Sequence, residues 1–374
     1  MNKLNRFAFN GKMAKAALVL LAAVLVFALA ACGGSGSGSS GGSSGQSGGS
    51  TSSSGGSSGG SSGGGSSGGS SDNKTYTIRI SYQVPENHFG HYASQRFKEM
   101  VEERSGGRLQ VELYPGGVLG GLRDNTENVA QGVIEMAWTD LGSASIFFPK
   151  SGLISLPFLF RDYDHVEKFF DGEIGQQVME ELRQASGIRI LAPIHAGFRS
   201  IISNKPINSA DDMRGLKLRV PEIPLYTNFA QLLGAAPTPI PGGEIYTSLQ
   251  TGVVDAAEGP VNYIYDTSLH EVAKYITHTY HIYTDYDLAI NDKFYQSLPD
   301  DLRQIIDQTA KEVTAETRKK VRDEIQGYEE TLAGLMTVTE VDVEAFKAKM
   351  TPLYEEFGKQ NNAEQLLNDI MNIQ

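Results

Sequence analysis

The chain has 374 residues, of which 32 are Lys or Arg and 44 are Asp or Glu, so its formal net charge is −12. Residues 33–71 are Gly or Ser except at Gln46 and Thr51, which leaves residues 72–374 as the part with the composition of a folded body. Four basic residues and no acidic one precede this body, so the body is more acidic than the whole chain. That charge argues against nucleic-acid binding, which needs a basic surface. The single cysteine, Cys32, excludes a disulfide framework and a cysteine-based zinc site.

The first 32 residues have the pattern of an export signal. Basic residues precede an unbroken apolar run over 16–31, which is shorter than the about 20 residues that a spanning helix needs. The run ends Leu29-Ala30-Ala31-Cys32, which resembles the bacterial lipobox, where the cysteine becomes the lipidated first residue of the mature protein. This resemblance implies membrane anchoring through lipidated Cys32 on the extracytoplasmic face of the cell membrane. The alternative is an uncleaved anchor with an incidental cysteine.

The Gly/Ser tract, taken as a linker over 33–72, has no side chains able to form a core, so we expect it to be disordered. A flexible coil of this length reaches about 30–37 Å. Such a tether keeps a folded body close to a membrane and suits a protein that acts with a membrane partner.

The body starts with alternating strand and helix patterns, which predict an α/β lobe with a mostly parallel sheet. We assign this lobe I to 73–196 plus about 285–320. Its expected strands cover 76–82, 109–114, 134–139 and 188–193, and its expected helices cover 88–104, 125–131, 164–170 and 175–184.

A second α/β set begins near Gly197, and we assign this lobe II to 197–284 plus about 325–374. The pattern from 298 to about 330 is helical without an internal proline, which is longer than an ordinary globular helix and predicts a helix that crosses both lobes. The other elements expected in this part are strands over 216–220 and 253–257, a capping turn at 209–212, and helices over 226–233, 244–251, 262–270, 343–349 and 363–371.

The body lacks the common catalytic motifs, since it has no Walker-type loop, no G-x-G-x-x-G after a strand, no H-E-x-x-H and no G-x-S-x-G. His88 and His91, like His278 and His281, are spaced i, i+3, but a zinc site needs further ligands, and exposed polar histidines are the alternative. We therefore expect a protein that is not an enzyme and has no metal or other cofactor.

Three segments carry a family resemblance. They are G-L-K-L-R-V-P at 215–221, G-A-A-P-T-P at 234–239 and E-I-Y-T-S-L-Q-T-G-V-V-D at 244–255. Together with L-Y-P at 113–115 and L-P-F at 156–158, they closely resemble the DctP-type substrate-binding proteins of tripartite ATP-independent periplasmic (TRAP) transporters. The resemblance covers essentially the whole body.

The resemblance implies a periplasmic-binding-protein-like α/β fold, with two lobes, a hinge and a long bridging helix. It also implies a function, namely the capture of a small organic acid and its delivery to membrane permease subunits. The arginine of L-R-V-P, which fixes the ligand carboxylate in the family, is Arg219 here, and a second arginine corresponds to Arg199. A guanidinium binds a carboxylate bidentately, and the end of a short strand before Pro221 points to the ligand edge of an α/β sheet. The alternative for Arg219 is an internal salt bridge.

Further pocket positions are carried over from the family. Gln83 follows the first strand, and Asp140 falls where sialic-acid binders have an acidic residue, although it is also placed to cap the helix that follows. Glu258 lies beside a position that is often asparagine in the family and is Gly259 here. Gly242-Gly243 likewise replaces a common aromatic-small pair. Both departures leave the ligand open among uronates, C4-dicarboxylates, keto acids and sialic acids, with or without a bound cation.

Aromatic side chains either line the pocket or belong to the core. The candidates are Trp138, Tyr82, Tyr226, Tyr263 and Tyr265. Other functions compatible with an exported two-lobed protein are an ABC-type solute-binding lipoprotein, a ligand sensor for a receptor kinase and a surface-anchored hydrolase.

Overall fold

The structure is a computed structural model that describes residues 74–374. The expected signal segment, Cys32 and the Gly/Ser linker lie outside the described residues. Within the described part of the chain, no helix combines the length and the apolar character needed to cross a membrane.

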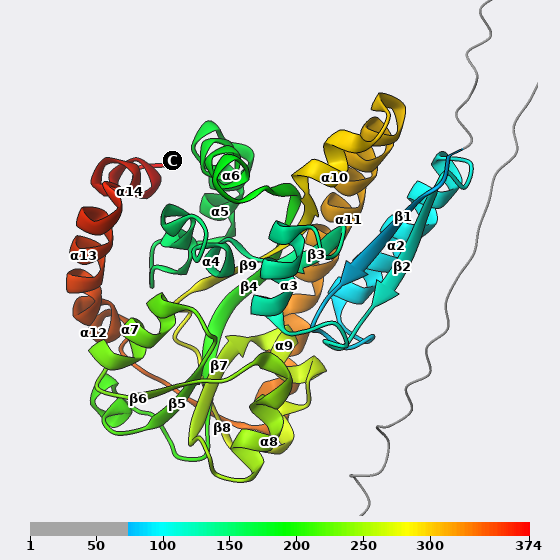
Figure 1. Cartoon of the computed structure of the whole chain (residues 1–374). Coiled ribbons are helices and arrows are strands. Elements are labelled where there is room, and N and C mark those ends of the chain that lie inside the picture. Colours follow the sequence, from blue (N-terminus) through cyan, green and yellow to red (C-terminus); the bar gives the residue numbers. More distant parts are fainter. Residues whose placement is uncertain (1–73) are drawn as a thin grey trace, which may run out of the picture. The chain divides into compact units, whose positions relative to one another are not determined.

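The strands and helices alternate through most of the described chain (Figure 1). The strands are β1 (Tyr76–Ser81), β2 (Leu109–Tyr114), β3 (Met136–Thr139), β4 (Ile188–Ser203), β5 (Lys217–Val220), β6 (Ala236–Pro239), β7 (Ala256–Pro260), β8 (Tyr275–Thr277), β9 (Tyr283–Asn291) and β10 (Thr337–Thr339). The helices of the first half are α2 (Phe89–Arg104), α3 (Leu122–Gln131), α4 (Leu141–Ala144), α5 (Tyr163–Asp171), α6 (Glu173–Ser186), α7 (Pro224–Leu232) and α8 (Ile245–Gln250). Those of the second half are α9 (Val261–Asp266), α10 (Asp292–Ser297), α11 (Asp300–Leu335), α12 (Val343–Lys347), α13 (Thr351–Asn361) and α14 (Glu364–Met371).

Hydrogen bonding joins the strands along the order β2-β1-β3-β9-β4-β7-β5-β6, with β8 beside β4 and β10 beside β8. The strand β4 lies inside this path and pairs with the strands on both sides of it. Its residues 188–198 pair with β9, and its residues 199–203 pair with β7. We therefore call β2, β1, β3, β9 and the first part of β4 the lobe I sheet, and the second part of β4 with β5 to β8 and β10 the lobe II sheet. A chain segment that continues from one sheet into the other joins the two lobes.

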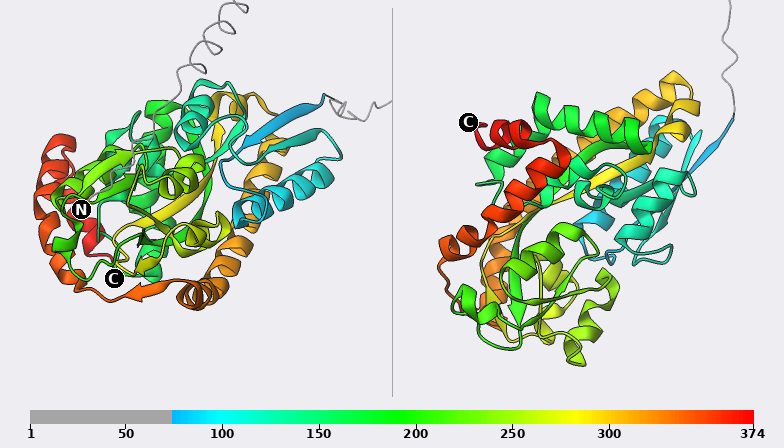
Figure 2. Two further views of the ribbon diagram at one scale, coloured as in Figure 1. Left: turned by 90° about the horizontal axis from the view of Figure 1, so that it is seen from below. Right: turned by 60° about the vertical axis from the view of Figure 1, so that its left-hand side comes forward.

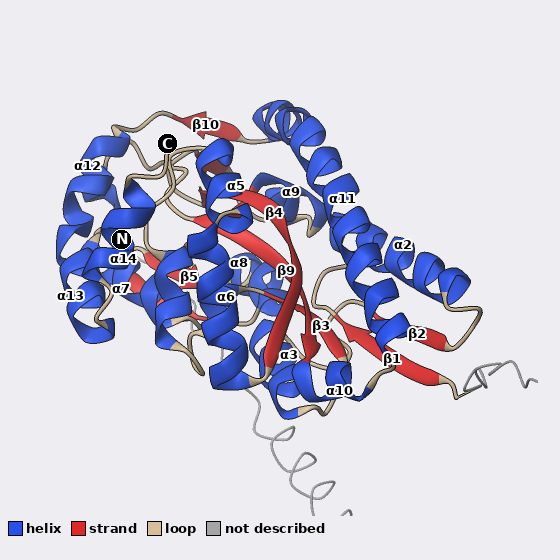
Figure 3. Cartoon of the chain, turned by 90° about the horizontal axis from the view of Figure 1, so that it is seen from above, coloured by secondary structure: helices blue, strands red, loops and turns tan. Residues whose placement is uncertain are grey.

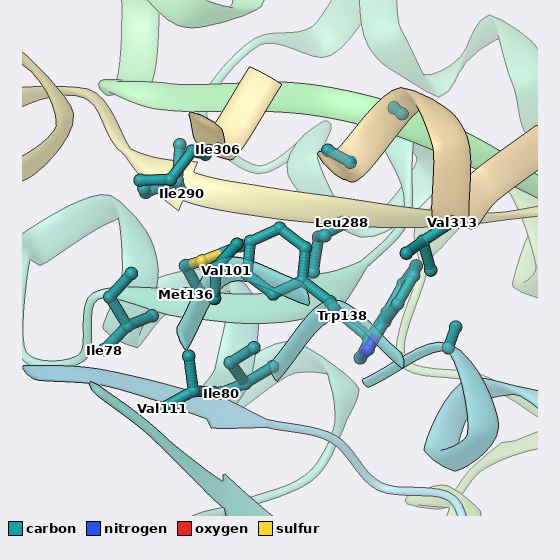
Figure 4. Packing of buried hydrophobic residues seen from close by; sticks show 14 of the residues in the cluster. Ile78, Ile80, Val101, Val111, Met136, Trp138, Leu288, Ile290, Ile306 and Val313 are labelled. Carbon is teal, nitrogen blue, oxygen red and sulfur yellow. The ribbon is translucent and has the colours of Figure 1, made fainter. Parts of the chain in front are cut away.

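Two hydrophobic clusters cover the two faces of the lobe I sheet. On one face, Trp138 and Leu288 of the sheet contact α2 and the first half of α11, which supplies Val313 (Figure 4). Figure 3 shows α2 and α11 running side by side on this face. On the other face, Phe169 from α5 packs with side chains of α6, α13 and α14, among them Phe357. The C-terminal helices, red in Figure 2, thus lie against lobe I.

The helix α11 is the longest element of the described chain, with 36 residues, which corresponds to about 54 Å. Its Leu302 and Val313 belong to the cluster on the lobe I sheet. Its Leu332 belongs to a different cluster, with Ile202 and Ile276 of the lobe II sheet. One helix therefore contributes to the cores of both lobes, as the uninterrupted helical pattern predicted.

Most of the expected elements are present, with ends shifted by a few residues. The expected strand over 188–193 is too short, since β4 continues to Ser203, and the strand expected over 253–257 lies at 256–260. The strand β9, at Tyr283–Asn291, is not indicated by the sequence pattern. Its sequence, YTDYDLAIN, places aspartates within an otherwise apolar strand, so it lacks the pattern of a buried strand even though most of it is buried.

Gly197 lies at the point where β4 leaves β9. The register between the two strands shifts between the pairs of His195 and Gly197, and the φ angle of Gly197 is +121°. A Cβ atom at this position would lie 3.1 Å from the Tyr163 hydroxyl and 3.5 Å from Ile325. Both the backbone conformation and the close neighbours therefore favour glycine.

We expect Gly197→Ala to lower the free energy of unfolding by about 1–3 kcal/mol, because a side chain is strained at this φ. Gly327→Ala is the matched control. Gly327 lies inside α11 with no atom within 4 Å of an added Cβ, so alanine there should raise stability by about 0.5–1 kcal/mol. Urea unfolding measures the free energies of both variants, and equal stability of the two would contradict the requirement for glycine at position 197.

Candidate functional site

A cavity lies where the carboxyl ends of strands from the two sheets meet. Lobe I contributes Gln83, after β1, and Asp140, after β3. Lobe II contributes Arg219 near the end of β5, and β4 contributes Arg199 at the point where it passes between the sheets. Ligands of open α/β folds bind at this edge of the strands. Four of the five residues singled out from the sequence therefore line one cavity.

Arg219 is buried, with 4% of its surface exposed. Its Nε and Nη2 donate to the carbonyl oxygen of Ile240 at 2.8 and 2.6 Å. No carboxylate lies within 4.0 Å of its guanidinium among residues 74–374, so the internal salt bridge weighed above is not formed there. Burial lowers the pKa of Arg219, partly offset by Tyr263 and Glu258. A guanidinium remains charged even so, and the site holds a buried cation that has no direct counterion within residues 74–374.

Arg199 differs from Arg219 because its charge is neutralised within the protein. Its Nε and Nη2 donate to the two carboxylate oxygens of Glu258, and the Nη2–Oε1 distance is 2.8 Å. Its Nη1 donates to the Thr284 hydroxyl at 3.0 Å, and its guanidinium lies 5.1 Å from the centre of the Tyr226 ring. Burial acts to lower the pKa of Arg199, but Glu258 outweighs it and raises that pKa.

Glu258 is fully buried and does not line the cavity. Burial acts to raise the pKa of its carboxyl, but the guanidinium of Arg199 and the His281 ring outweigh this effect and lower it to about 2. His281 Nε2 lies 3.4 Å from the carboxylate, and the His281 ring stacks on Phe229 at 4.6 Å between centroids. The structure therefore places Glu258 behind Arg199, where it orients the guanidinium, and not on the cavity wall.

Asp140 both caps a helix and lines the cavity. Its side chain accepts a hydrogen bond from the backbone N–H of Ser143 as the N-cap of α4. Burial raises the pKa of the Asp140 carboxyl, against the hydrogen bonds from Ser143 and the charge of Arg199. Asp140 therefore serves both as a helix cap and as a cavity residue.

Gln83 also lines the cavity, and its Oε1 is buried without a hydrogen-bond partner among the described residues.

The strand β9 adds residues that the sequence analysis did not identify. Thr284, Asp285 and Tyr286 all line the cavity. Asp285 accepts from the backbone N–H of Leu141 at 2.8 Å, and both oxygens of the fully buried Asp287 lack a hydrogen-bond partner among the described residues. Since β9 was not predicted, only the i, i+2 spacing of its aspartates was available as a signal.

Burial and the nearby Asp140 raise the pKa of Asp285 to about 7. Burial and Asp285 raise the pKa of Asp287 well above its ordinary value. Two adjacent buried carboxyls share a proton more readily than they carry two charges. Within residues 74–374, no group of three His, Cys, Asp or Glu side chains is arranged to hold a metal ion.

The aromatic candidates lie in three different environments, namely the cavity, the core and the surface. Tyr226 and Tyr263 line the cavity. Trp138 and Tyr82 are fully buried in the cluster on the lobe I sheet, and Tyr265 is 38% exposed.

Comparison with known proteins assigns the family. Residues 80–361 match the family described as bacterial extracellular solute-binding protein, family 7 (DctP). The chain belongs to this family. It is 32% identical over 286 residues to the sialic acid-binding periplasmic protein SiaP of Vibrio cholerae, covering 76% of this chain and 89% of that protein. It is 30% identical over 275 residues to the 2,3-diketo-L-gulonate-binding periplasmic protein YiaO of Escherichia coli, covering 72% of this chain and 83% of that protein.

Solved structures give the same result for the fold of this solute-binding protein. A TRAP periplasmic solute-binding protein from Polaromonas, bound to D-erythronate, superposes with a TM-score of 0.76 at 30% identity, covering 80% of this chain and 99% of that one. One from Roseobacter denitrificans with bound β-D-glucuronate gives a TM-score of 0.77 at 29% identity, covering 80% of this chain and all of that one. The predicted periplasmic-binding-protein-like fold with a long bridging helix is confirmed, as is the TRAP solute-binding function.

The buried carboxyl pair makes stability depend on pH. Carboxyls whose pKa is raised in the folded state bind more protons there than in the unfolded state, so their stabilising effect is complete below about pH 4 and is lost as pH rises through about 7. We expect Asp287→Asn to remove part of this loss. Its free energy of unfolding should exceed that of the parent by about 1–3 kcal/mol at pH 8, and by less at pH 5.

Urea unfolding at pH 5 and pH 8 measures this difference. Asp369→Asn, at an exposed position of α14, is the control and should follow the parent at both values. An Asp287→Asn variant whose pH dependence equals that of the parent would show that the carboxyl pair does not titrate in this range.

Proposed function

We propose that this protein captures a hydroxylated monocarboxylic acid, a sugar acid, and that Arg219 binds its carboxylate. The observation that carries the proposal is the buried guanidinium of Arg219, which has no carboxylate within 4.0 Å among the described residues and faces the cavity. Removing a charge from water is costly unless it is paired. An anionic ligand group supplies that pair, and a carboxylate matches the donors of a guanidinium.

The proposal of a single bound carboxylate rests on the difference between the two arginines. The charge of Arg199 is already matched by Glu258, so of these two arginines Arg219 is the one without a carboxylate partner among the described residues. The carboxyls of Asp140 and Asp285 line the same cavity and disfavour a second anionic group on the ligand. They are suited to accept hydrogen bonds from ligand hydroxyls.

The named ligands of similar proteins support the same class. The proteins with bound D-erythronate, β-D-glucuronate and L-galactonate all hold hydroxylated carboxylates. The curated relatives also include a C4-dicarboxylate-binding protein, from Rhodobacter capsulatus, at 29% identity. The pairing of Arg199 with Glu258 favours the sugar acids over that second class.

We expect Arg219→Ala to weaken binding of the best ligand among D-erythronate, D-glucuronate, D-galacturonate and galactonate by on the order of a hundredfold or more. Hydrogen bonds to charged groups contribute roughly 1.5–3 kcal/mol each, and about 1.4 kcal/mol corresponds to tenfold in affinity. Arg219→Lys keeps the charge but loses the paired donors, so it should recover part of the loss. Titration calorimetry measures all three proteins.

Arg123→Ala is the matched control for this experiment. Arg123 also borders the cavity, but its side chain is 51% exposed and pairs with Glu127, so its removal should change affinity less than threefold. The ligand-free stability of Arg219→Ala should be unchanged or higher, because a buried unpaired charge is removed. Binding by Arg219→Ala within threefold of the parent would refute the carboxylate assignment and direct the same test to Arg199.

The partner that receives the ligand is proposed to be the membrane permease pair of a TRAP transporter. Family membership supports this partner. We propose that lobe I comprises 73–196 with about 285–320 and that lobe II comprises 197–284 with about 325–350, in place of the 325–374 expected from the sequence. The lobes would close on the ligand by rotation about β4 and β9. The packing of α13 and α14 with α5 suggests that the C-terminal part from 351 moves with lobe I.

We further propose that the mature protein is a lipoprotein held at the extracytoplasmic face of the membrane by Cys32. The support is the sequence, in which the only cysteine directly follows a short apolar run and directly precedes the Gly/Ser tract. The relatives from Vibrio cholerae and Escherichia coli are named as periplasmic proteins, which supports an extracytoplasmic location.

Cys32→Ala should release the protein from membranes, because the thiol that carries the lipid is lost, while ligand affinity remains that of the parent. Membrane flotation of cell extracts, followed by calorimetry on the released protein, measures both properties. Tight membrane association of Cys32→Ala would instead support an uncleaved apolar anchor over 16–31.

A further inference from the structure

We propose that Tyr286 determines the ligand specificity of the cavity by donating a hydrogen bond from its hydroxyl to a hydroxyl group of the bound acid, which in turn donates to Asp140. The inference rests on the proposed function, since it concerns the same cavity. It assigns to a residue of β9 the preference of the cavity for hydroxylated acids over their deoxy analogues.

The ring of Tyr286 is held in one position by its neighbours. It stacks on Trp138, with centroids 4.9 Å apart and an angle of 3° between the ring planes. The rings of Phe89 and His88 contact it edge-on, at 5.7 and 5.9 Å. On another side lies Gly90, where an added Cβ would be only 2.6 Å from Cε1 of the tyrosine. The hydroxyl is therefore fixed in place before a ligand arrives, which lowers the entropic cost of using it.

The hydroxyl of Tyr286 has no hydrogen-bond partner among the described residues, although the side chain is buried and only 6% of the residue is exposed. Two neighbouring tyrosines have one, since the Tyr82 hydroxyl pairs with His91 at 2.7 Å and the Tyr263 hydroxyl donates to the Gly242 carbonyl at 3.2 Å. An unpaired buried polar group costs stability and calls for an explanation. Tyr286 also lines the cavity, and we take a ligand atom that binds beside it as the partner of its hydroxyl.

The chemistry of the neighbours indicates which ligand atom is bound. Burial keeps the pKa of Tyr286 well above its ordinary value, so the hydroxyl is a neutral donor, and the Asp140 carboxyl is near enough to raise that pKa further. Both residues line the cavity, one as a donor and the other as an acceptor. A ligand hydroxyl both accepts and donates, so it satisfies the two together. A deoxy analogue leaves both unpaired, and sites of this kind reject such analogues strongly.

The test combines a protein variant with ligand variants. D-erythronate and its three monodeoxy analogues (2,3-, 2,4- and 3,4-dihydroxybutanoate) are titrated calorimetrically into the full-length protein and into Tyr286→Phe. We expect Tyr286→Phe to bind D-erythronate about tenfold more weakly, the loss of one hydrogen bond. For one monodeoxy analogue, the parent and Tyr286→Phe should bind equally, because the hydroxyl that Tyr286 contacts is missing. Tyr354→Phe, whose hydroxyl donates to the Pro157 carbonyl at 2.8 Å and does not line the cavity, should bind all four acids as the parent does.

The same variants are also melted without ligand. Tyr286→Phe should unfold at the same temperature as the parent or higher, because it removes an unpaired polar group, whereas Tyr354→Phe should unfold lower. Unchanged affinity of Tyr286→Phe for D-erythronate, or an equal loss for all four acids, overturns the inference and leaves the proposed function intact. If the parent binds none of these acids nor the uronates and galactonate, the proposed function fails and the inference fails with it.

Discussion

The buried positive charge of Arg219 is the constraint on which the arrangement of the site depends. A guanidinium cannot lose its proton at physiological pH, so its burial has to be compensated by nearby dipoles and by a ligand. The carbonyl of Ile240, at the end of the neighbouring strand, supplies the first part of that compensation. In the proposed function a ligand carboxylate supplies the remainder, and the two sheets bring their polar strand ends together beside this charge.

The second arginine shows how the protein limits the positive charge that a ligand meets. Glu258 pairs with Arg199 from the adjacent strand β7, and His281 contacts the same carboxylate from behind. The combined charge of Arg199 and Glu258 is close to zero, and the ion pair holds the Arg199 side chain beside the cavity. The cavity thus combines one guanidinium that has no carboxylate partner among the described residues with walls that include an internally paired arginine and the carboxyls of Asp140 and Asp285.

The sequence was sufficient to predict the elements with a clear pattern and the residues that lie in continuous motifs. Arg219 lies near the end of a short strand that is followed by Pro221, and α11 has no internal proline, so both were predictable from local sequence. By contrast, β9 carries Asp285, Tyr286 and Asp287 in a strand that is buried because β3 and β4 flank it and helices cover both faces of the sheet. The role of Glu258 was also not predictable, because its contact with Arg199 depends on the pairing of strands distant in sequence.

The position of β9 in the lobe I sheet has a consequence for how the chain acquires its structure. Met136 of β3 pairs with Ile290 of β9, although all of β5 to β8 lies between them in the sequence. This inner strand of the lobe I sheet is therefore available only after most of the lobe II sheet has been synthesised, and α11 follows later still. Neither half can complete its core as the chain emerges, and contacts of such high sequence separation slow folding. A polypeptide with this topology therefore becomes compact late, after β9 and α11 have both been synthesised.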